Sequence, residues 1–148
     1  MLIVDLYNKQ LKIIRGIPGS GKTTYVNENY PEAFVCSADD YFEEVADLND
    51  TSYAEEFKPW LVGKAHQHCW GSFIQAVVVM DEPLVVVDNT NTNKWECDNY
   101  GFLAELMGYE VEIVEIPFEA DKAEVYHERN THGVPLEVIQ RMIEHYES

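Results

Sequence analysis

The stretch Gly16-Ile17-Pro18-Gly19-Ser20-Gly21-Lys22-Thr23 decides how the chain folds around it. It matches the Walker A pattern G-x-x-x-x-G-K-[ST] at every fixed position. It follows an apolar run at residues 11–15 that predicts a buried strand, and a helix is expected to begin at Gly21. In such a P-loop, backbone N–H groups point inward at a di- or triphosphate, and the helix adds the positive end of its dipole. A glycine-rich turn without a ligand is the alternative, and the strand and helix around the motif disfavour it.

The P-loop pattern also predicts roles for individual side chains. Lys22 is expected to reach the β- and γ-phosphates and to be catalytic, while the Thr23 hydroxyl is expected to bind Mg²⁺. The predicted nucleotide-binding residues are Gly16, Pro18, Gly19, Ser20, Gly21, Lys22, Thr23 and Thr24. The sequence therefore predicts a binding site for a nucleoside triphosphate and Mg²⁺.

Short apolar runs alternate with longer amphipathic segments on both sides of the P-loop. This alternation predicts an α/β P-loop NTPase fold, with a short, mainly parallel sheet flanked by helices and a small C-terminal lid. Strands are expected at residues 11–15, 33–36, 84–87 and 110–116, with a further antiparallel strand at 2–7. Helices are expected at 21–30, 59–80, 95–107, 119–130 and 135–146. In the longest helix the predicted core-facing residues are Leu61, Ala65, Cys69, Phe73, Ala76 and Met80.

Length and composition indicate the number of domains, the cellular compartment and the class of partner. Its 148 residues, with no linker or repeat, predict a single domain spanning residues 1–148. Three cysteines without a C-x-x-C pair argue against a disulfide framework or a zinc site and favour a reducing compartment. With no leader pattern or membrane-length apolar run, we expect a cytoplasmic protein without a membrane partner. The formal charge of -17 disfavours duplex nucleic acid as a partner, although acidity can serve solubility alone.

An acidic residue ends the strand predicted at 84–87. This residue, Asp88, is expected to hold Mg²⁺ directly or through water, and the alternative is an aspartate that caps a turn. The polar run at residues 89–93 follows it, and Asn89 and Asn91 are candidate substrate-binding residues at the carboxyl end of the sheet. Turn chemistry and a helix N-cap explain the same run equally well.

Other candidate site residues come from the remaining segments. Asp39 follows the strand at 33–36 and is expected to accept the proton of an attacking hydroxyl, with Asp40 as a candidate substrate neighbour. An N-cap pair is the alternative for the two aspartates. Arg129 in a lid could stabilise charge on a migrating phosphoryl group, or it is a plain surface arginine. His66 is a candidate substrate contact, although a hydrogen-bonded core histidine is the more ordinary interpretation.

Taken in order, these pieces resemble the polynucleotide-kinase-like P-loop kinases, a family that includes the kinase domain of the bacteriophage polynucleotide 5′-kinase. The matching segments are Arg15–Thr24, Asp39-Asp40-Tyr41, Ala65-His66, Asp88-Asn89-Thr90-Asn91, Gly108-Tyr109-Glu110-Val111, Arg129-Asn130 and His132-Gly133-Val134-Pro135. The resemblance implies ATP and Mg²⁺ as cofactors, and transfer of the γ-phosphoryl group to a hydroxyl acceptor. It also implies Asp39 as the general base and Arg129 as the lid arginine on the donor phosphates.

The chain departs from the phage enzyme at two places. Phe42 stands where that enzyme has an arginine for the acceptor's phosphate, and Thr131 and His132 stand where its lid carries further basic residues. Both changes remove cations that would grip a nucleic-acid end. The expected partners are therefore ATP and a hydroxyl-bearing acceptor, either a nucleic-acid 5′-OH end or a small molecule. A nucleoside, nucleotide or metabolite kinase and an ATP-dependent switch with slow hydrolysis are the alternatives.

Overall fold

The structure is a computed structural model that describes residues 8–147, so the strand predicted at 2–7 lies outside the described residues. Four parallel strands form one sheet in the order β2-β3-β1-β4. Their bounds are β1 (Gln10–Arg15), β2 (Phe34–Cys36), β3 (Leu84–Asp88) and β4 (Glu110–Glu115). The predicted α/β class and parallel sheet are confirmed, and all four predicted strands within the described residues are present.

The sheet places the carboxyl ends of the two central strands side by side. β1 and β3 pair in parallel with Ile13 opposite Val87 and Ile14 opposite Asp88. Both strands read as near-continuous apolar runs because both of their faces are covered, which is usual for parallel sheets. The P-loop therefore begins next to Asp88, since β1 continues directly into it.

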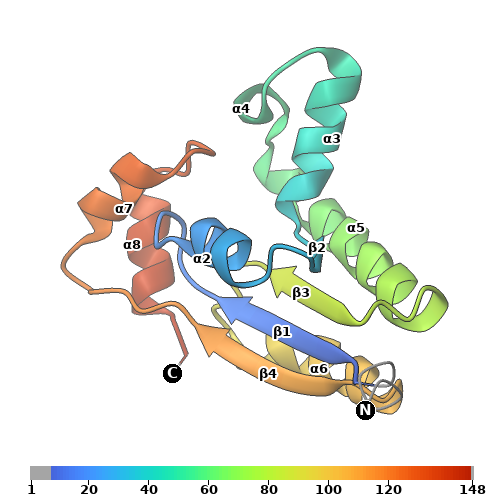
Figure 1. Ribbon diagram of the computed structural model, residues 1–148. Coiled ribbons are helices and arrows are strands. Elements are labelled where there is room, and N and C mark those ends of the chain that lie inside the picture. The colour runs from blue at the N-terminus through green and yellow to red at the C-terminus, as the bar shows by residue number, and fades with distance from the viewer. Residues whose placement is uncertain (1–7, 148) are drawn as a thin grey trace.

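Helices cover the two faces of the sheet (Figure 1). α5 (Val62–Ile74) and α6 (Lys94–Leu106) pack on one face around Phe73 and Tyr100. α2 (Lys22–Asn29) packs on the opposite face through Val26. This layering leaves the P-loop and the start of α2 at the edge where the strands end.

The helix predicted at 59–80 is divided into three parts. A 3-10 turn, η1 (Pro59–Leu61), precedes α5, and a π-helical turn, η2 (Gln75–Val79), follows it. Four of the six predicted core residues are buried, namely Ala65, Cys69, Phe73 and Ala76. Met80 is 47% exposed, so its prediction as a core residue was wrong. Its N–H bonds to Gln75 O five residues back, and this wider turn rotates Met80 off the apolar stripe.

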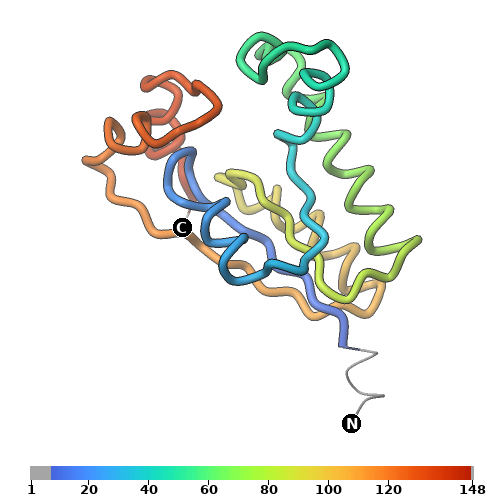
Figure 2. Tube along the Cα trace, turned by 45° about the horizontal axis from the view of Figure 1, so that its top comes forward, coloured from blue at the N-terminus to red at the C-terminus, as the bar shows by residue number. Residues whose placement is uncertain are grey.

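Two arms extend from the sheet on either side of the P-loop (Figures 1 and 2). One contains α3 (Asp39–Asn49) and α4 (Tyr53–Glu56), and α4 was not predicted. The other, which we call the lid, contains α7 (Ala123–Arg129) and α8 (Leu136–Glu144). The helix predicted to begin at residue 119 begins at 123, because Glu119 and Lys122 form a separate turn. None of the helices in residues 8–147 is long and apolar enough to cross a membrane.

Candidate active site

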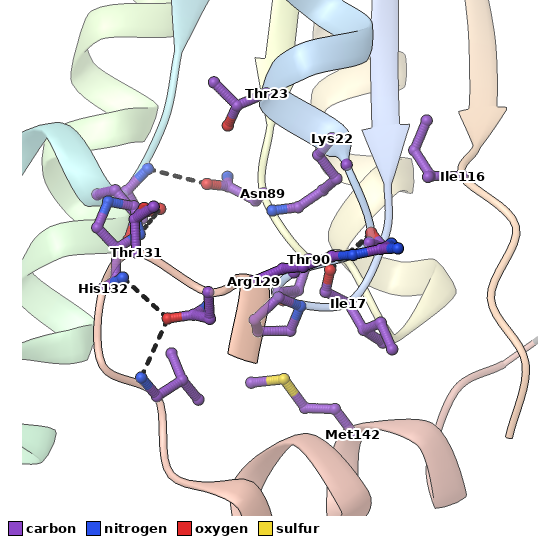
Figure 3. Close-up of a pocket in the computed structure, with 18 of the residues that line it drawn as sticks. Ile17, Lys22, Thr23, Asn89, Thr90, Ile116, Arg129, Thr131, His132 and Met142 are labelled. Carbon is purple, nitrogen blue, oxygen red and sulfur yellow. Dashed lines mark hydrogen bonds and ion pairs between the residues drawn. The ribbon is translucent and has the colours of Figure 1, made fainter. Parts of the chain in front are cut away.

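A cavity of about 1310 Å³ lies between the P-loop, the α3–α4 arm and the lid. Figure 3 shows Lys22 entering it from α2, with Thr131 and His132 of the lid loop on the far side. The predicted site residues that line it are Pro18, Gly19, Ser20, Gly21, Lys22, Thr23, Thr24, Asp39, His66, Asn89 and Arg129. The structure thus brings together most of the residues that the sequence singled out.

The P-loop has the backbone conformation that an anion cradle needs. Gly19 and Gly21 have φ values of 78° and 100°, a region that side chains disfavour. Gly16 N–H donates to Thr90 O at 3.1 Å, which ties the start of the loop to the end of β3. A β-carbon on Gly19 would collide with the Tyr126 carbonyl of the lid. Glycine is therefore required at position 19 for both its φ angle and this close approach.

Lys22 and Asp88 form an ion pair beside the P-loop. Lys22 Nζ lies 3.8 Å from Asp88 Oδ1, and their side chains are 13% and 9% exposed. Burial raises the pKa of Asp88, while Lys22 and the Thr23 hydroxyl act in the opposite direction. Asp88 Oδ1 is buried with no hydrogen-bond partner among the described residues. A buried carboxylate oxygen that accepts no hydrogen bond within the described residues, beside a phosphate cradle, fits an Mg²⁺ ligand.

The protein alone does not build a full metal cage at this place. Within residues 8–147 no group of three or more His, Cys, Asp or Glu side chains could hold a metal ion. Mg²⁺ commonly binds through one or two carboxylates together with substrate phosphates and water. Thr23 and Asp88 therefore suit a magnesium ion that arrives with a nucleotide.

The polar run after Asp88 has structural hydrogen bonds. Asn89 Oδ1 accepts from Ala38 N–H at 2.8 Å, which joins the end of β3 to the start of α3 (Figure 3). Asn91 is 2% exposed, and its amide donates to Ile14 O at 2.8 Å. Asn93 forms a capping box with Glu96 at the start of α6. Asn89 lines the cavity. Asn91 lies outside the lining, and its hydrogen bond agrees with the alternative interpretation of this run as turn chemistry.

Arg15 has a structural role that sequence reasoning did not find. Its side chain is buried, and Nε donates to Asn91 O at 2.7 Å. Its Nη1 lies 3.0 Å from Glu115 Oε1, and the guanidinium lies 4.4 Å from the centre of the Tyr146 ring. These contacts occupy the arginine next to the P-loop, so it joins β1, β4 and the chain after α8 instead of facing the cavity.

Asp39 is held by two side chains from distant segments. Tyr53 OH donates to Asp39 Oδ1 at 2.7 Å, and His132 Nδ1 lies 3.5 Å from Asp39 Oδ2. The Tyr53 and His132 rings stack, with centroids 4.2 Å apart. No spacing pattern signals these partners, because they lie 14 and 93 positions away along the chain.

The two aspartates have different surroundings although they are neighbours. α3 begins at Asp39, and Ala38 is its N-cap residue, so an N-cap role for Asp39 and Asp40 was wrong. Asp39 lines the cavity, whereas Asp40 does not. Burial, followed by the charges of Glu43, Glu44 and Asp39, raises the pKa of Asp40 to about 6.

The lid loop positions His132 over the α3–α4 arm. Asn130 Oδ1 accepts from the N–H groups of His132 and Val134, at 2.8 and 3.2 Å, and so folds the loop. His132 Nε2 also lies 3.4 Å from Glu43 Oε1. Arg129 is exposed and lines the cavity between the lid and the P-loop (Figure 3). His66 is exposed at the cavity wall, so its interpretation as a core histidine was wrong.

The cavity has two chemically different walls, which we call the donor wall and the acceptor wall. The P-loop and Lys22 line the donor wall, where Asp88 lies outside the lining but 3.8 Å from Lys22, and the α3–α4 arm with Asp39 lines the acceptor wall. Arg129 belongs to the lid between them. A carboxylate, a phosphate cradle and a free arginine around one cavity are the groups that phosphoryl transfer needs.

Comparisons with known proteins agree with this geometry. A family model described as "AAA domain" matches residues 11–148. NEDD4-binding protein 2 from Homo sapiens is 33% identical in an alignment of 141 residues that covers 93% of this chain and 8% of that protein. A gluconokinase structure from Sinorhizobium meliloti 1021 has a TM-score of 0.55 at 16% identity, covering 96% of this chain and 77% of that one. The gluconokinase likeness shows a kinase-like P-loop fold, and the chain spans only a small part of the human relative.

Proposed function

Because the chain belongs to the AAA domain family and has a kinase-like P-loop fold, we propose that it transfers the γ-phosphoryl group of ATP to a hydroxyl acceptor. The observation that carries the proposal is Asp39, a carboxylate on the cavity wall opposite the P-loop. A nucleotide-dependent switch needs a phosphate cradle but no acceptor-side carboxylate. We also propose that residues 1–148 act as one domain.

On the donor wall, the P-loop N–H groups, Lys22 and Thr23 would bind the β- and γ-phosphates of ATP. Mg²⁺, held by Thr23 and Asp88, would supply positive charge to the phosphate oxygens. Arg129 in the lid would stabilise charge that grows on the migrating phosphoryl group. Lys22, Thr23 and Arg129 line the same cavity, so positioning and electrostatics would supply most of the expected rate enhancement.

On the acceptor wall, Asp39 would orient the attacking hydroxyl and take its proton. The acceptor oxygen forms a bond to the γ-phosphorus, the bond from that phosphorus to the β–γ bridging oxygen breaks, and ADP leaves. In a loose transition state the proton moves late, so orientation of the hydroxyl contributes much of the benefit. An acceptor hydroxyl would replace His132 on Asp39 Oδ2, where the contact is longer than the one from Tyr53.

Two observations favour different classes of acceptor. The resemblance to polynucleotide-kinase-like P-loop kinases favours a nucleic-acid 5′-OH end. The acidic chain, with 27 Asp and Glu against 10 Lys and Arg, favours a nucleoside or another small metabolite. Both acceptors would use the same donor wall and the same Asp39.

The proposal is tested by the dependence of ADP release on an acceptor. Purified protein is given ATP and Mg²⁺ with and without nucleosides, sugars and 5′-OH oligonucleotides, and phosphorylated product is measured by mass spectrometry. We expect ADP release that rises with one acceptor and equals the product formed. Slow ADP release that no acceptor changes would contradict a kinase and favour the switch.

A pair of arginine variants tests the position of the site. Arg129→Ala should lower kcat by about a hundredfold, the effect of losing one charge-stabilising donor. Arg141→Ala is the matched control, because Arg141 lies on α8 outside the cavity lining and should have little effect. Melting temperatures of both variants should stay near the parent value, since neither arginine belongs to the apolar core. Equal activities of the two variants would place catalysis elsewhere.

A further inference from the structure

The acceptor wall is built mainly from aromatic rings. Tyr53 stacks on His132 at 4.2 Å and on Phe57 at 6.0 Å, and it meets Phe42 edge to face at 5.5 Å. All four side chains line the cavity. Rings and sugar C–H faces pack favourably on such a surface, which buries apolar area.

The charges near this wall are negative. Asp39 lines it, and Glu43 lies beside it with its carboxylate 3.4 Å from His132. Among the described cavity-lining residues, the lysines and arginines are Lys22 and Arg129. Lys22 lies on the donor wall beside Asp88, and Arg129 extends from α7 toward the P-loop (Figure 3). The acceptor wall therefore has no lysine or arginine of its own within the described residues.

A phosphate next to the acceptor hydroxyl would meet these carboxylates without a matching cation. Proteins that bind phosphate groups do so through arginine, lysine or clustered backbone N–H groups. Here Phe42 is 3% exposed and packed among rings, and the helix that begins at Asp39 carries two acidic residues in its first turn. Those carboxylates lie at the positive end of α3, so within the described residues the acceptor wall has neither a lysine or arginine nor an unopposed helix N-terminus for an anion.

We propose that the acceptor is an uncharged ring compound whose hydroxyl lies at Asp39 and whose ring packs against Tyr53 and His132. This inference rests on the proposed kinase function and narrows its acceptor. A nucleoside without phosphate belongs to this class, whereas a polynucleotide end carries a phosphate one sugar away from its 5′-hydroxyl and does not. The lid completes the binding surface, because His132 supplies one of the two stacked rings.

Matched acceptor pairs test the proposal directly. Each pair shares a ring and a free hydroxyl and differs in one phosphate: adenosine with adenosine 3′-monophosphate, thymidine with thymidine 3′-monophosphate, and glucose with glucose 1-phosphate. Transfer from ATP is followed by mass spectrometry, and ATP·Mg²⁺ binding is measured separately by calorimetry. We expect kcat/KM for the uncharged member of the active pair to be at least about tenfold higher, the scale of one unfavourable charge contact.

The outcomes separate the two proposals. Equal or better transfer to the phosphate-bearing member overturns the acceptor class and leaves the kinase function in place. ATP binding without transfer to any member of the panel overturns both.

A charge variant gives a second, independent readout. Glu43→Lys should reduce the preference for the uncharged member by about tenfold, because it replaces a negative charge beside His132 with a positive one. Glu105→Lys makes the same change on α6, at an exposed position outside the cavity lining, and should leave the preference unchanged. The same shift in both variants would mean that net charge, and not the acceptor wall, sets the preference.

Discussion

The donor wall and the acceptor wall of the cavity are held in different ways. On the donor wall, the Lys22 and Asp88 side chains are 13% and 9% exposed and lie at the start of α2 and the end of β3. On the acceptor wall, the Asp39 and His132 side chains are 40% and 27% exposed. The first wall is fixed by backbone geometry in the sheet. The second is assembled by side chains that meet from α3, α4 and the lid.

The two walls should therefore differ in how readily substitutions change them. A wall whose position is set by β1, β3 and the glycines of the P-loop presents the same groups to every nucleotide. A wall joined by the contacts of Tyr53 and His132 can change with small substitutions in α3, α4 or the lid loop. Donor chemistry should therefore be robust to change on the acceptor side, and the variants below test that separation.

Lys22→Ala should have the largest effect, at least about a thousandfold on phosphoryl transfer, because Lys22 meets charge that grows in the transition state. Transfer is measured with any acceptor that the chain uses, and circular dichroism confirms that the variant is folded. Asn27→Ala is the control, since Asn27 is exposed on the same helix and lies outside the cavity lining. Near-parent turnover by folded Lys22→Ala protein would remove the P-loop from the active site.

Asp39→Asn should come next, at about a hundredfold on transfer. This value is the low end for a general base, because the hydroxyl loses its proton late and an amide still orients it. ATP·Mg²⁺ affinity, measured by calorimetry, should stay within about twofold, since Lys22, Thr23 and Asp88 are unchanged. Loss of ATP·Mg²⁺ binding would instead make Asp39 a metal ligand and break the separation of the two walls.

Tyr53→Phe should have a smaller effect on transfer than Asp39→Asn, and it tests the acceptor wall alone. The variant keeps the ring that stacks on His132 and removes the hydroxyl that donates to Asp39. Losing a hydrogen bond worth about 1 kcal/mol should lower kcat for the acceptor about fivefold. The KM for ATP should not change. Tyr41→Phe, on the same arm and outside the cavity lining, is the control, and equal kcat values for the two variants would leave Tyr53 without a positioning role.

Asp40→Asn should change stability more than activity. Burial raises the pKa of Asp40 to about 6, so the folded protein holds a proton between about pH 4 and 6 that the unfolded chain releases. Stability of the parent therefore falls as pH rises through this window. Without the ionisable group, the variant should be more stable by about 1 kcal/mol at pH 7.5, a value reduced for solvent screening, and equal to the parent near pH 4.

Urea unfolding at pH 4, 5, 6 and 7.5 measures this difference. Asp47→Asn provides the matched control, since Asp47 is an exposed aspartate on the same helix. A difference between Asp40→Asn and the parent that does not vary with pH would contradict a raised pKa as its cause.

The sequence predicted the donor wall well because its signals are local. The P-loop lies within eight consecutive residues, and the apolar runs before it and before Asp88 have the composition of buried parallel strands. Because the two strands are parallel neighbours in the sheet, the P-loop and Asp88 lie at the same edge. The same reasoning found Asp39, because it lies three residues after the last residue of a predicted strand.

The partners of Asp39 and the course of the long helix could not be predicted in the same way. The contacts of Tyr53 and His132 depend on how two arms fold back over the P-loop, and no periodicity encodes that arrangement. A π-helical turn changes the register of an apolar stripe without changing its composition, so Met80 was placed on the wrong face. The hydrogen-bond partners of Arg15 lie 76 or more positions later in the chain, beyond the range of any local pattern.

The packing of Ile17 gives the lid a thermodynamic connection to the nucleotide. Ile17 is a fully buried residue of the P-loop, and it shares one apolar cluster with Ala123, Tyr126 and Ile139 of the lid. A nucleotide that orders the loop therefore stabilises the lid by linkage through this cluster. Amide hydrogens around Ile139 should exchange more slowly with solvent deuterium when ATP is bound, and unchanged exchange would show that the two elements open independently. Through this cluster, a nucleotide bound at the P-loop would lengthen the time that the lid stays folded over the cavity.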